Sequence, residues 1–387
     1  MTGKIAIIYS DDYKKYYFGP DHPLRPQRLE LAIKLMESIG ILNDPNVTLV
    51  EPQLCEEEEL ELVHSPEYIE MVKYFSKTGE GYLDYGDTPA FPGMFEVTRN
   101  IVGGSLKAAD LINAGKVQHA FNIGGGLHHA TRSRGSGFCV FNDIACTIRY
   151  IQRKYHLKRI MIVDFDCHHA DGTQDAFYSE PSVLTLSLHE DGTYLFPGSG
   201  FVFETGEGEG KGYCVNIPLP PHTFDEAYIY AFNEIVPPLV RAYQPEILLQ
   251  QSGVDTHYTD PLTSEAITIN TYVKVFGTMH KLAHEVCDGK YLMFGGGGYQ
   301  MDVVARAWTS MLCEILNLPI PKETPETWRE LYENISRKIG LNTHAPISMG
   351  DPEVIIDERM KKKIFEEVKQ VVREVKERIF PIHGIEL

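Results

Sequence analysis

Cysteines and long apolar runs are both scarce in this chain of 387 residues. The seven cysteines are odd in number and scattered, and no C-x-x-C pair occurs. Such a set is typical of thiols that stay reduced in a cytoplasmic protein rather than of a disulfide framework. No apolar stretch reaches the length of about 18 residues that a membrane-spanning helix needs, and residues 1–5 lead into a strand-like run instead of a signal peptide. The sequence therefore predicts a cytoplasmic protein outside the membrane.

Basic residues are also in the minority. The chain has 36 basic and 54 acidic residues, and its formal net charge is −18. A surface of this sign repels the phosphates of nucleic acids and anionic membranes, so we expect no direct nucleic-acid or membrane partner. Charge alone leaves the oligomeric state unknown.

Short apolar runs alternate with longer amphipathic ones along most of the chain. The sequence predicts strands at 5–9, 119–123, 160–164, 183–188, 213–217, 247–251 and 291–294, and helices at 26–39, 66–77, 95–114, 140–155, 224–243, 268–287 and 299–316. This alternation is typical of a single large α/β domain in which helices cover both faces of a mostly parallel sheet.

The pattern changes near residue 318. Two charged helical stretches follow, at 323–337 and 352–379. We therefore predict a catalytic core at residues 1–318 and a C-terminal helical extension at residues 319–387, which packs on the core or extends it.

A polar motif directly follows the apolar run at 159–163. Asp164, Asp166 and His168 occupy every second position, and in an extended chain such side chains share one face. Carboxylates and an imidazole together form a ligand set for a divalent transition metal such as zinc. Ligands of open parallel sheets lie beyond the carboxyl ends of the strands, and this motif stands at such an end.

Two more motifs follow predicted strands. His128 and His129 come after three glycines, and histidines are acid–base groups near neutral pH. Asp255 follows the run at 247–251 and is a natural third metal ligand. A histidine pair is more often structural when it occurs alone, and a lone acid is often a helix cap. Here the co-occurrence of the motifs favours one catalytic metal site with an open position.

Four glycines at 295–298 precede Tyr299. Their backbone amides could cradle a phosphate, but no Lys-Ser/Thr follows, which excludes a P-loop. The alternative is a glycine hinge that brings the Tyr299 hydroxyl to a reacting carbonyl group.

Taken together, these motifs resemble the zinc-dependent histone deacetylase family of the arginase–deacetylase fold, and they are most similar to its prokaryotic branch of acetoin-utilisation-type deacetylases. The resemblance runs from about residue 5 to about residue 317. Its landmarks, in order, are Asp21-His22-Pro23 with Arg28, residues 124–129, Ser136-Gly137-Phe138-Cys139, residues 164–172, Phe196-Pro197-Gly198, Asp255 and residues 295–299.

The resemblance implies a role for each matching residue. The zinc ligands would be Asp166, His168 and Asp255; the catalytic groups His129 (general base, then acid), His128 (electrostatic partner), Asp164 and Asp171 (carboxylates behind the histidines) and Tyr299 (carbonyl-polarising hydroxyl). The substrate-binding groups would be Phe138 and Phe196 (tunnel walls), Gly137 (tunnel floor), Asp87 (rim acid) and Leu262 (tunnel mouth). Arg28 would line an acetate-exit cavity, and Asp164 with Ser187 would bind a monovalent cation, K⁺ or Na⁺.

The implied activity is zinc-dependent hydrolysis of the acetyl amide of Nε-acetyl-lysine in a protein or peptide, with release of acetate. A deacetylase of small acetylated amines such as acetylpolyamines is an alternative, although Leu262 stands where acetylpolyamine deacetylases of the family have a glutamate. A non-catalytic acetyl-lysine-binding scaffold would have lost one of the ligands, histidines or Tyr299, and none is missing. A binuclear manganese hydrolase of the same fold would need an acid at Gly253. Cys167, inside the metal motif, is a departure from the family and is expected to face away from the metal.

Overall fold

The computed structural model describes residues 3–387, and within this range the strands form one eight-stranded sheet in which all neighbours are parallel. Its order is β2-β1-β3-β8-β7-β4-β5-β6. The strands are β1 (Ile5–Ile8), β2 (Val47–Val50), β3 (His119–Asn122), β4 (Ile160–Asp164), β5 (Val183–Glu190), β6 (Cys214–Leu219), β7 (Ile247–Gln251) and β8 (Tyr291–Phe294). The predicted α/β fold with a parallel sheet is confirmed.

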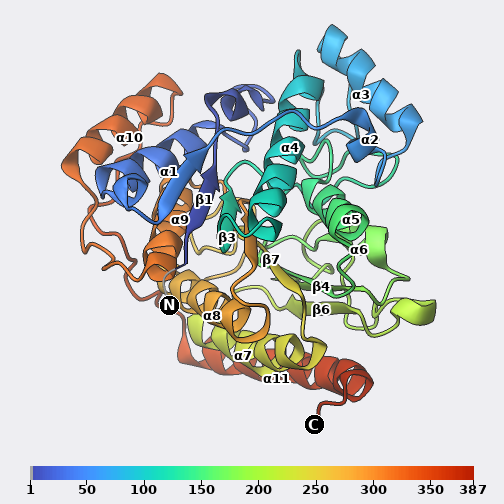
Figure 1. Ribbon diagram of the computed structural model, residues 1–387. Coiled ribbons are helices and arrows are strands. Elements are labelled where there is room, and N and C mark those ends of the chain that lie inside the picture. The colour runs from blue at the N-terminus through green and yellow to red at the C-terminus, as the bar shows by residue number, and fades with distance from the viewer. Residues whose placement is uncertain (1–2) are drawn as a thin grey trace.

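Helices cover both faces of the sheet, and this explains why every strand except β2 is buried along its whole length. On one face α1 (Gln27–Ser38), α9 (Met301–Leu316), α8 (Ile269–Val286) and α7 (Asp225–Tyr243) pack side by side in that order (Figure 1). The other face carries α4 (Met94–Asn113), α5 (Asp143–Tyr155) and α6 (Asp171–Phe177), with α3 (Pro66–Thr78) against α4 and the short α2 (Glu57–Leu60) against α5.

The four central strands, β3, β8, β7 and β4, position the functional residues. They are neighbours in the sheet and run in the same direction, so the loops that follow them meet at one edge. The register aligns Asp164 at the end of β4 with Gln251 of β7 on one side and Ser187 of β5 on the other. The predicted motifs at 124–129, 164–172, 252–256 and 295–299 all start at this carboxyl edge, as the rule for open parallel sheets requires.

The two C-terminal helices pack against the rest of the molecule. Helix α10 (Glu326–Lys338) lies beside α1, where the indole of the buried Trp328 donates a 2.9 Å hydrogen bond to the carbonyl oxygen of Leu31. Helix α11 (Glu358–Ile379) packs on α7 and β6 (Figure 1). The boundary between core and extension at residue 318 stays a prediction.

In the described part of the chain, residues 3–387, no helix has both the length and the apolar character that crossing a membrane would demand. The cytoplasmic location stays a prediction.

Candidate active site

Two carboxylates and one imidazole converge just beyond the ends of β4 and β7. The Nδ1 atom of His168 lies 3.1 Å from Oδ1 of Asp166 and 3.2 Å from Oδ2 of Asp255. All three side chains are buried, and one ligand atom from each lies within 4.8 Å of the others. The residues predicted as metal ligands are thus brought together from two loops that are almost 90 positions apart in the sequence.

The charge and the shape of this triad fit a divalent cation. Burial and the neighbouring charge of Asp166 raise the pKa of Asp255 to about 6, and a cation between the two carboxylates would remove this repulsion. The backbone leaves room at the same point, because a Cβ atom at Gly297 would lie 2.1 Å from Oδ2 of Asp255 and 2.5 Å from Oδ2 of Asp166. Two carboxylates and an imidazole suit zinc and leave a position open for substrate.

The backbone just before Asp255 leaves no room for the extra acid that a second metal ion would need. A Cβ atom at Gly253 would lie 2.5 Å from Oδ2 of Asp166, so an acidic side chain would not fit at this position. This steric conflict with Asp166 explains the glycine at position 253, and it disfavours a binuclear manganese site.

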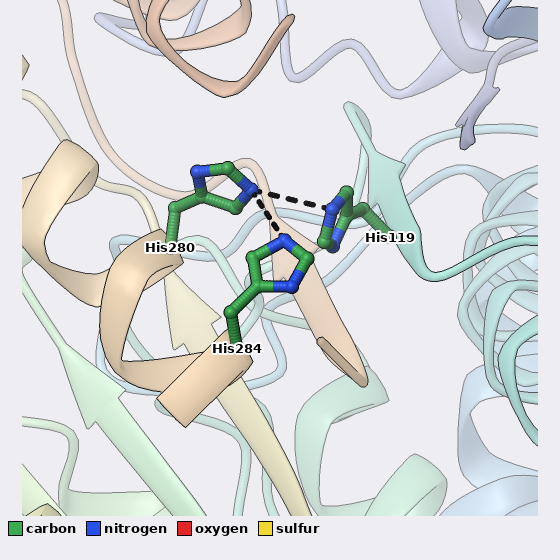
Figure 2. Close-up of side chains that lie close together, drawn as sticks. All are labelled: His119, His280 and His284. Carbon is green, nitrogen blue, oxygen red and sulfur yellow. Dashed lines mark hydrogen bonds between the residues drawn. The ribbon is translucent and has the colours of Figure 1, made fainter. Parts of the chain in front are cut away.

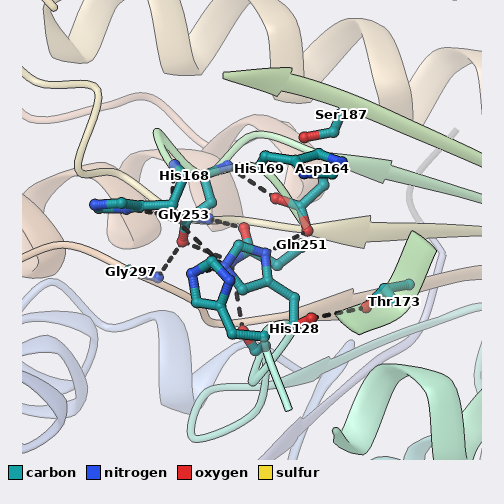
Figure 3. A network of polar contacts seen from close by, with 12 residues as sticks. His128, Asp164, His168, His169, Thr173, Ser187, Gln251, Gly253 and Gly297 are labelled. Carbon is teal, nitrogen blue, oxygen red and sulfur yellow. Dashed lines mark hydrogen bonds and ion pairs between the residues drawn. The ribbon is translucent and has the colours of Figure 1, made fainter. Parts of the chain in front are cut away.

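Each histidine of the pair is held by its own carboxylate. Nδ1 of His128 lies 2.9 Å from Asp164, and Nδ1 of His129 lies 2.7 Å from Asp171 (Figure 3 shows His128 beside Asp164). The two Nε2 atoms are 3.0 Å apart. An ionised carboxylate can only accept hydrogen bonds, so each ring carries a proton on Nδ1. Nε2 is then the atom that can exchange a proton.

The two histidines differ in charge. Burial opposes the charging of His128, but the carboxylates of Asp164 and Asp166 outweigh it and raise its pKa to about 9. Burial, together with the neighbouring charge on His128, lowers the pKa of His129 to about 4. The two pKa shifts therefore run in opposite directions, and the charged form is favoured at His128 and the neutral form at His129.

Tyr299 and Arg28 line a small cavity that Asp166 of the triad also lines. That cavity is lined by Leu24, Arg28, Gly126, Leu127, His128, His129, Gly137, Phe138, Cys139, Asp166, Gly296, Gly297 and Tyr299. Burial, followed by the charges of Asp255 and Asp166, raises the pKa of Tyr299 well above its usual range, so the phenol stays a hydrogen-bond donor. The buried guanidinium of Arg28 donates to the carbonyl oxygen of Gly298 at 3.0 Å.

Two aromatic side chains pack against the rings of the site. The ring of Phe196, 41% exposed, lies 5.1 Å from the ring of His129 and 6.3 Å from that of His168. The ring of Phe138 meets that of Tyr299 edge-on at 5.8 Å. Gly137 has a φ of 49°, and a Cβ atom there would lie 2.3 Å from the ring of His129, so only glycine fits between the wall and the base.

The predicted rim residues lie farther out. Asp87 is exposed, and its carbonyl oxygen is 3.2 Å from Nε2 of His22. Leu262 is half-buried, and its N–H donates to the carboxylate of Asp260, which also accepts from the N–H of Tyr299. The cavity at the triad is lined by neither Asp87 nor Leu262.

Ser187 lies beside Asp164 in the sheet register (Figure 3). Its hydroxyl is 2.8 Å from Nδ1 of His189. Asp164 and Ser187 both line one small cavity beside β5. The monovalent-cation site that the resemblance implies there stays a prediction.

Several residues that the motifs did not indicate hold the site in place. Gln251 donates from Nε2 to Asp166 at 2.7 Å, and the N–H of Gly297 donates to the same oxygen at 2.8 Å (Figure 3). Buried Asp143 accepts from the N–H groups of Gly126 and Leu127, which fixes the loop that precedes the histidines. The sequence offered one indication of the role of Gln251: β7 ends in Gln250-Gln251, where a buried strand would be expected to have apolar residues.

Cys167 is fully buried, and its thiol points toward Glu190, 3.8 Å away. Its N–H donates to Asp255 at 2.8 Å. The thiol therefore lies away from the triad, as expected for a residue between two that share the opposite face.

The chain is similar to known proteins in sequence and in fold. The model of the histone deacetylase domain matches residues 22–315. The chain is 44% identical over 331 residues to the acetoin utilization protein AcuC of Bacillus subtilis, which covers 84% of this chain and 85% of that protein. It is 38% identical over 347 residues to the protein of the same name from Staphylococcus aureus strain MSSA476, covering 87% and 88%.

Two solved structures share the fold. One is a histone deacetylase homologue from Aquifex aeolicus and the other a histone deacetylase homologue complexed with SAHA. Each has a TM-score of 0.80 and 30% sequence identity, and each alignment covers 95% of this chain and 100% of the other.

Proposed function

The chain belongs to the histone deacetylase family, and from this premise we propose that it is a zinc-dependent amidohydrolase that removes the acetyl group from Nε-acetyl-lysine of a protein or peptide and releases acetate. Family membership supports deacetylase activity, and hence that of a hydrolase. The observation that carries this proposal is the clustering of the Asp166–His168–Asp255 triad next to one cavity. Asp166, the two carboxylate-held histidines and Tyr299 line that cavity.

We assign the zinc site to Asp166, His168 and Asp255. Zinc, when bound, polarises a carbonyl group and lowers the pKa of water from 15.7 to about 7 in the best-known site. Gln251 and the N–H of Gly297 support this role, because they occupy one oxygen of Asp166 and so orient the carboxylate.

His129 is the proposed general base and acid. It is neutral near pH 7, and Asp171 keeps its proton on Nδ1, so Nε2 can take the proton from the attacking water and give it to the leaving amine of lysine. His128, cationic beside Asp164, stabilises the negative charge that develops during attack.

Tyr299 is the proposed donor to the oxyanion of the tetrahedral intermediate. Its phenol stays protonated, and it lines the same cavity as the two histidines. Removal of one such donor typically costs roughly 3 kcal/mol of transition-state stabilisation.

The aromatic walls favour a linear apolar chain. Phe138 and Phe196 stand on either side of Gly137 and would contact the methylene groups of an acetyl-lysine side chain. Exposed Asp87 would bind the backbone of the substrate at the rim. Arg28, which lines the same cavity, would line the exit for acetate.

The proposal has three further parts. A monovalent cation, K⁺ or Na⁺, would bind at Asp164 and Ser187, where the cavity beside β5 lies. The relatives are named for acetoin utilisation, and a role in that process is included in the proposal. Residues 1–318 would carry the activity.

Substrate choice is tested at Leu262. An ammonium group that enters an apolar rim loses hydration without compensation, so we expect the native enzyme to prefer an acetyl-lysine peptide over acetylspermidine in kcat/KM. Leu262→Glu would supply a charge partner and should shift the ratio toward acetylspermidine by about 10- to 100-fold. The measurement is kcat/KM for both substrates with both enzymes.

Leu262→Gln is the matched control, because it adds a polar group of the same size without the charge, and it should leave the ratio near its native value. A native preference for acetylspermidine would favour the alternative of a small-amine deacetylase and leave the zinc mechanism intact. No turnover of any acetylated substrate by zinc-loaded enzyme would instead favour a non-catalytic acetyl-lysine-binding scaffold.

A further inference from the structure

A second group of histidines lies at the opposite edge of the sheet from the candidate active site. His119 is the first residue of β3, and His280 and His284 are one turn apart on α8 (Figure 2). Residues four apart in a helix lie on the same face, so both α8 rings point at the start of β3. His119 and His280 are buried and His284 is half-buried.

The three rings point their nitrogen atoms at a common centre. Nε2 of His280 lies 3.3 Å from Nε2 of His119 and 3.0 Å from Nε2 of His284 (Figure 2), and one nitrogen of each ring lies within 4.8 Å of the other two. The ring planes are nearly perpendicular, with interplanar angles of 82°, 80° and 78°.

The 3.3 Å distance between His119 and His280 fits a metal site, and the proton count of the three rings disfavours a cluster held by hydrogen bonds alone. Zinc–nitrogen bonds of about 2.0–2.1 Å in a tetrahedral site place the nitrogens about 3.3–3.4 Å apart. An imidazole nitrogen holds either one proton or one lone pair. Nε2 of His280 therefore cannot make good hydrogen bonds with His119 and His284 at once unless both of them donate to it. One cation, in contrast, accepts all three lone pairs.

We propose that His119, His280 and His284 form a second metal site, separate from the catalytic one, which binds a divalent d-block cation such as Zn²⁺. Imidazole suits zinc, copper and nickel more than calcium or magnesium. The ion would fasten the start of β3 to α8. The cluster lies at the opposite edge of the sheet from the candidate active site, so its proposed role is structural support and not chemistry. The supported strand, β3, leads into the loop of His128 and His129.

The surroundings allow an ion to enter. A cavity lined by His280, Lys281, His284, Glu285, Glu314, Ile315 and Asn317 lies on the open side of the cluster, so water can fill a fourth position. On the closed side, Gly289 has a φ of 78°, and a Cβ atom there would lie 2.8 Å from the ring of His284. The turn after α8 thus closes over the cluster without blocking it.

The test counts zinc in the full-length protein. Chelator-stripped protein is dialysed against Zn²⁺, gel-filtered and analysed for metal. We expect two ions per chain in the native protein, one in Asp255→Ala, one in His284→Ala and none in the double variant. His284→Ala should keep the native turnover with zinc present, because His284 lies outside the active site.

Thermal unfolding gives a second readout that does not depend on activity. In the Asp255→Ala background, Zn²⁺ at about 100 times its dissociation constant should raise Tm by about 3 °C, and His284→Ala should remove this shift. His280→Ala is a second variant with the same expected loss. The control is His344→Ala, since its side chain is 90% exposed and belongs to neither cluster.

Two results would overturn the proposal: no zinc in Asp255→Ala, or equal zinc in Asp255→Ala with and without His284→Ala. Loss of zinc by His344→Ala to the same extent would also contradict it. Failure of the catalytic assignment would look different, because Asp255→Ala would then still hold as much zinc as the native protein.

Discussion

Replacing Asp255 with alanine should remove one zinc ion per chain and lower deacetylase turnover by more than about 10³-fold. The carboxylate is fully buried and lies 3.2 Å from His168, so its loss leaves two ligands where three are needed for a stable site. The loss in rate follows because a catalytic metal supplies several kcal/mol of charge stabilisation, and each 1.36 kcal/mol is about tenfold in rate. Metal content and kcat are measured on the same purified sample.

His168→Ala should behave in the same way, and it guards against a folding defect specific to Asp255. The control is Asp12→Ala, because this carboxylate is exposed and pairs with Lys15 at the surface. Should Asp255→Ala and His168→Ala both keep the native zinc content, the triad is not the zinc site. When either variant is combined with His284→Ala, the expected zinc content is zero ions per chain, so the two proposed sites do not obscure each other.

Tyr299→Phe should lower kcat by about 10²–10³ while zinc content and Tm stay near their native values. The substitution removes one hydroxyl group and little volume, and the hydroxyl is the proposed oxyanion donor. The ring contact with Phe138 at 5.8 Å is kept, so KM should change less than kcat. Steady-state kinetics with an acetyl-lysine peptide provide the measurement.

Tyr74→Phe makes the same chemical change at an exposed position on α3 and should have no effect. Near-native kcat in Tyr299→Phe would assign the oxyanion to another donor. A large rise in KM with unchanged kcat would indicate that Tyr299 binds the substrate equally in the ground state and the transition state.

Seven of the eight strands could be predicted because each is a short apolar run that ends in polar or glycine residues. The exception is β2 (Val47–Val50), an edge strand whose central residues, Thr48 and Leu49, are exposed. Helices on both faces bury the inner strands and impose the apolar pattern. The other edge strand, β6, is also buried, because α11 packs on it, whereas β2 stays partly exposed. Helix α6 (Asp171–Phe177) was also missed, since seven residues are too few to show a helical period.

The site was predictable wherever its residues follow strands as local motifs. Parallel strands end at one edge, so motifs that are distant in the chain must meet there. Gln251 and Asp143 lacked such a signal, because their contacts with Asp166 and the loop before His128 depend on the sheet register and on α5. The same holds for His119 and His280, which are 161 residues apart and meet only through the packing of α8 against the amino end of the sheet.

The proposed zinc mechanism is tested most directly by acetate release from an acetyl-lysine peptide, measured with chelator-stripped, full-length protein before and after zinc is restored. We expect negligible turnover in the stripped protein and recovery when the Asp166–His168–Asp255 site is filled, with no recovery in Asp255→Ala. Full turnover in protein shown to be free of metal, or no turnover in zinc-loaded native protein, would contradict the proposed mechanism.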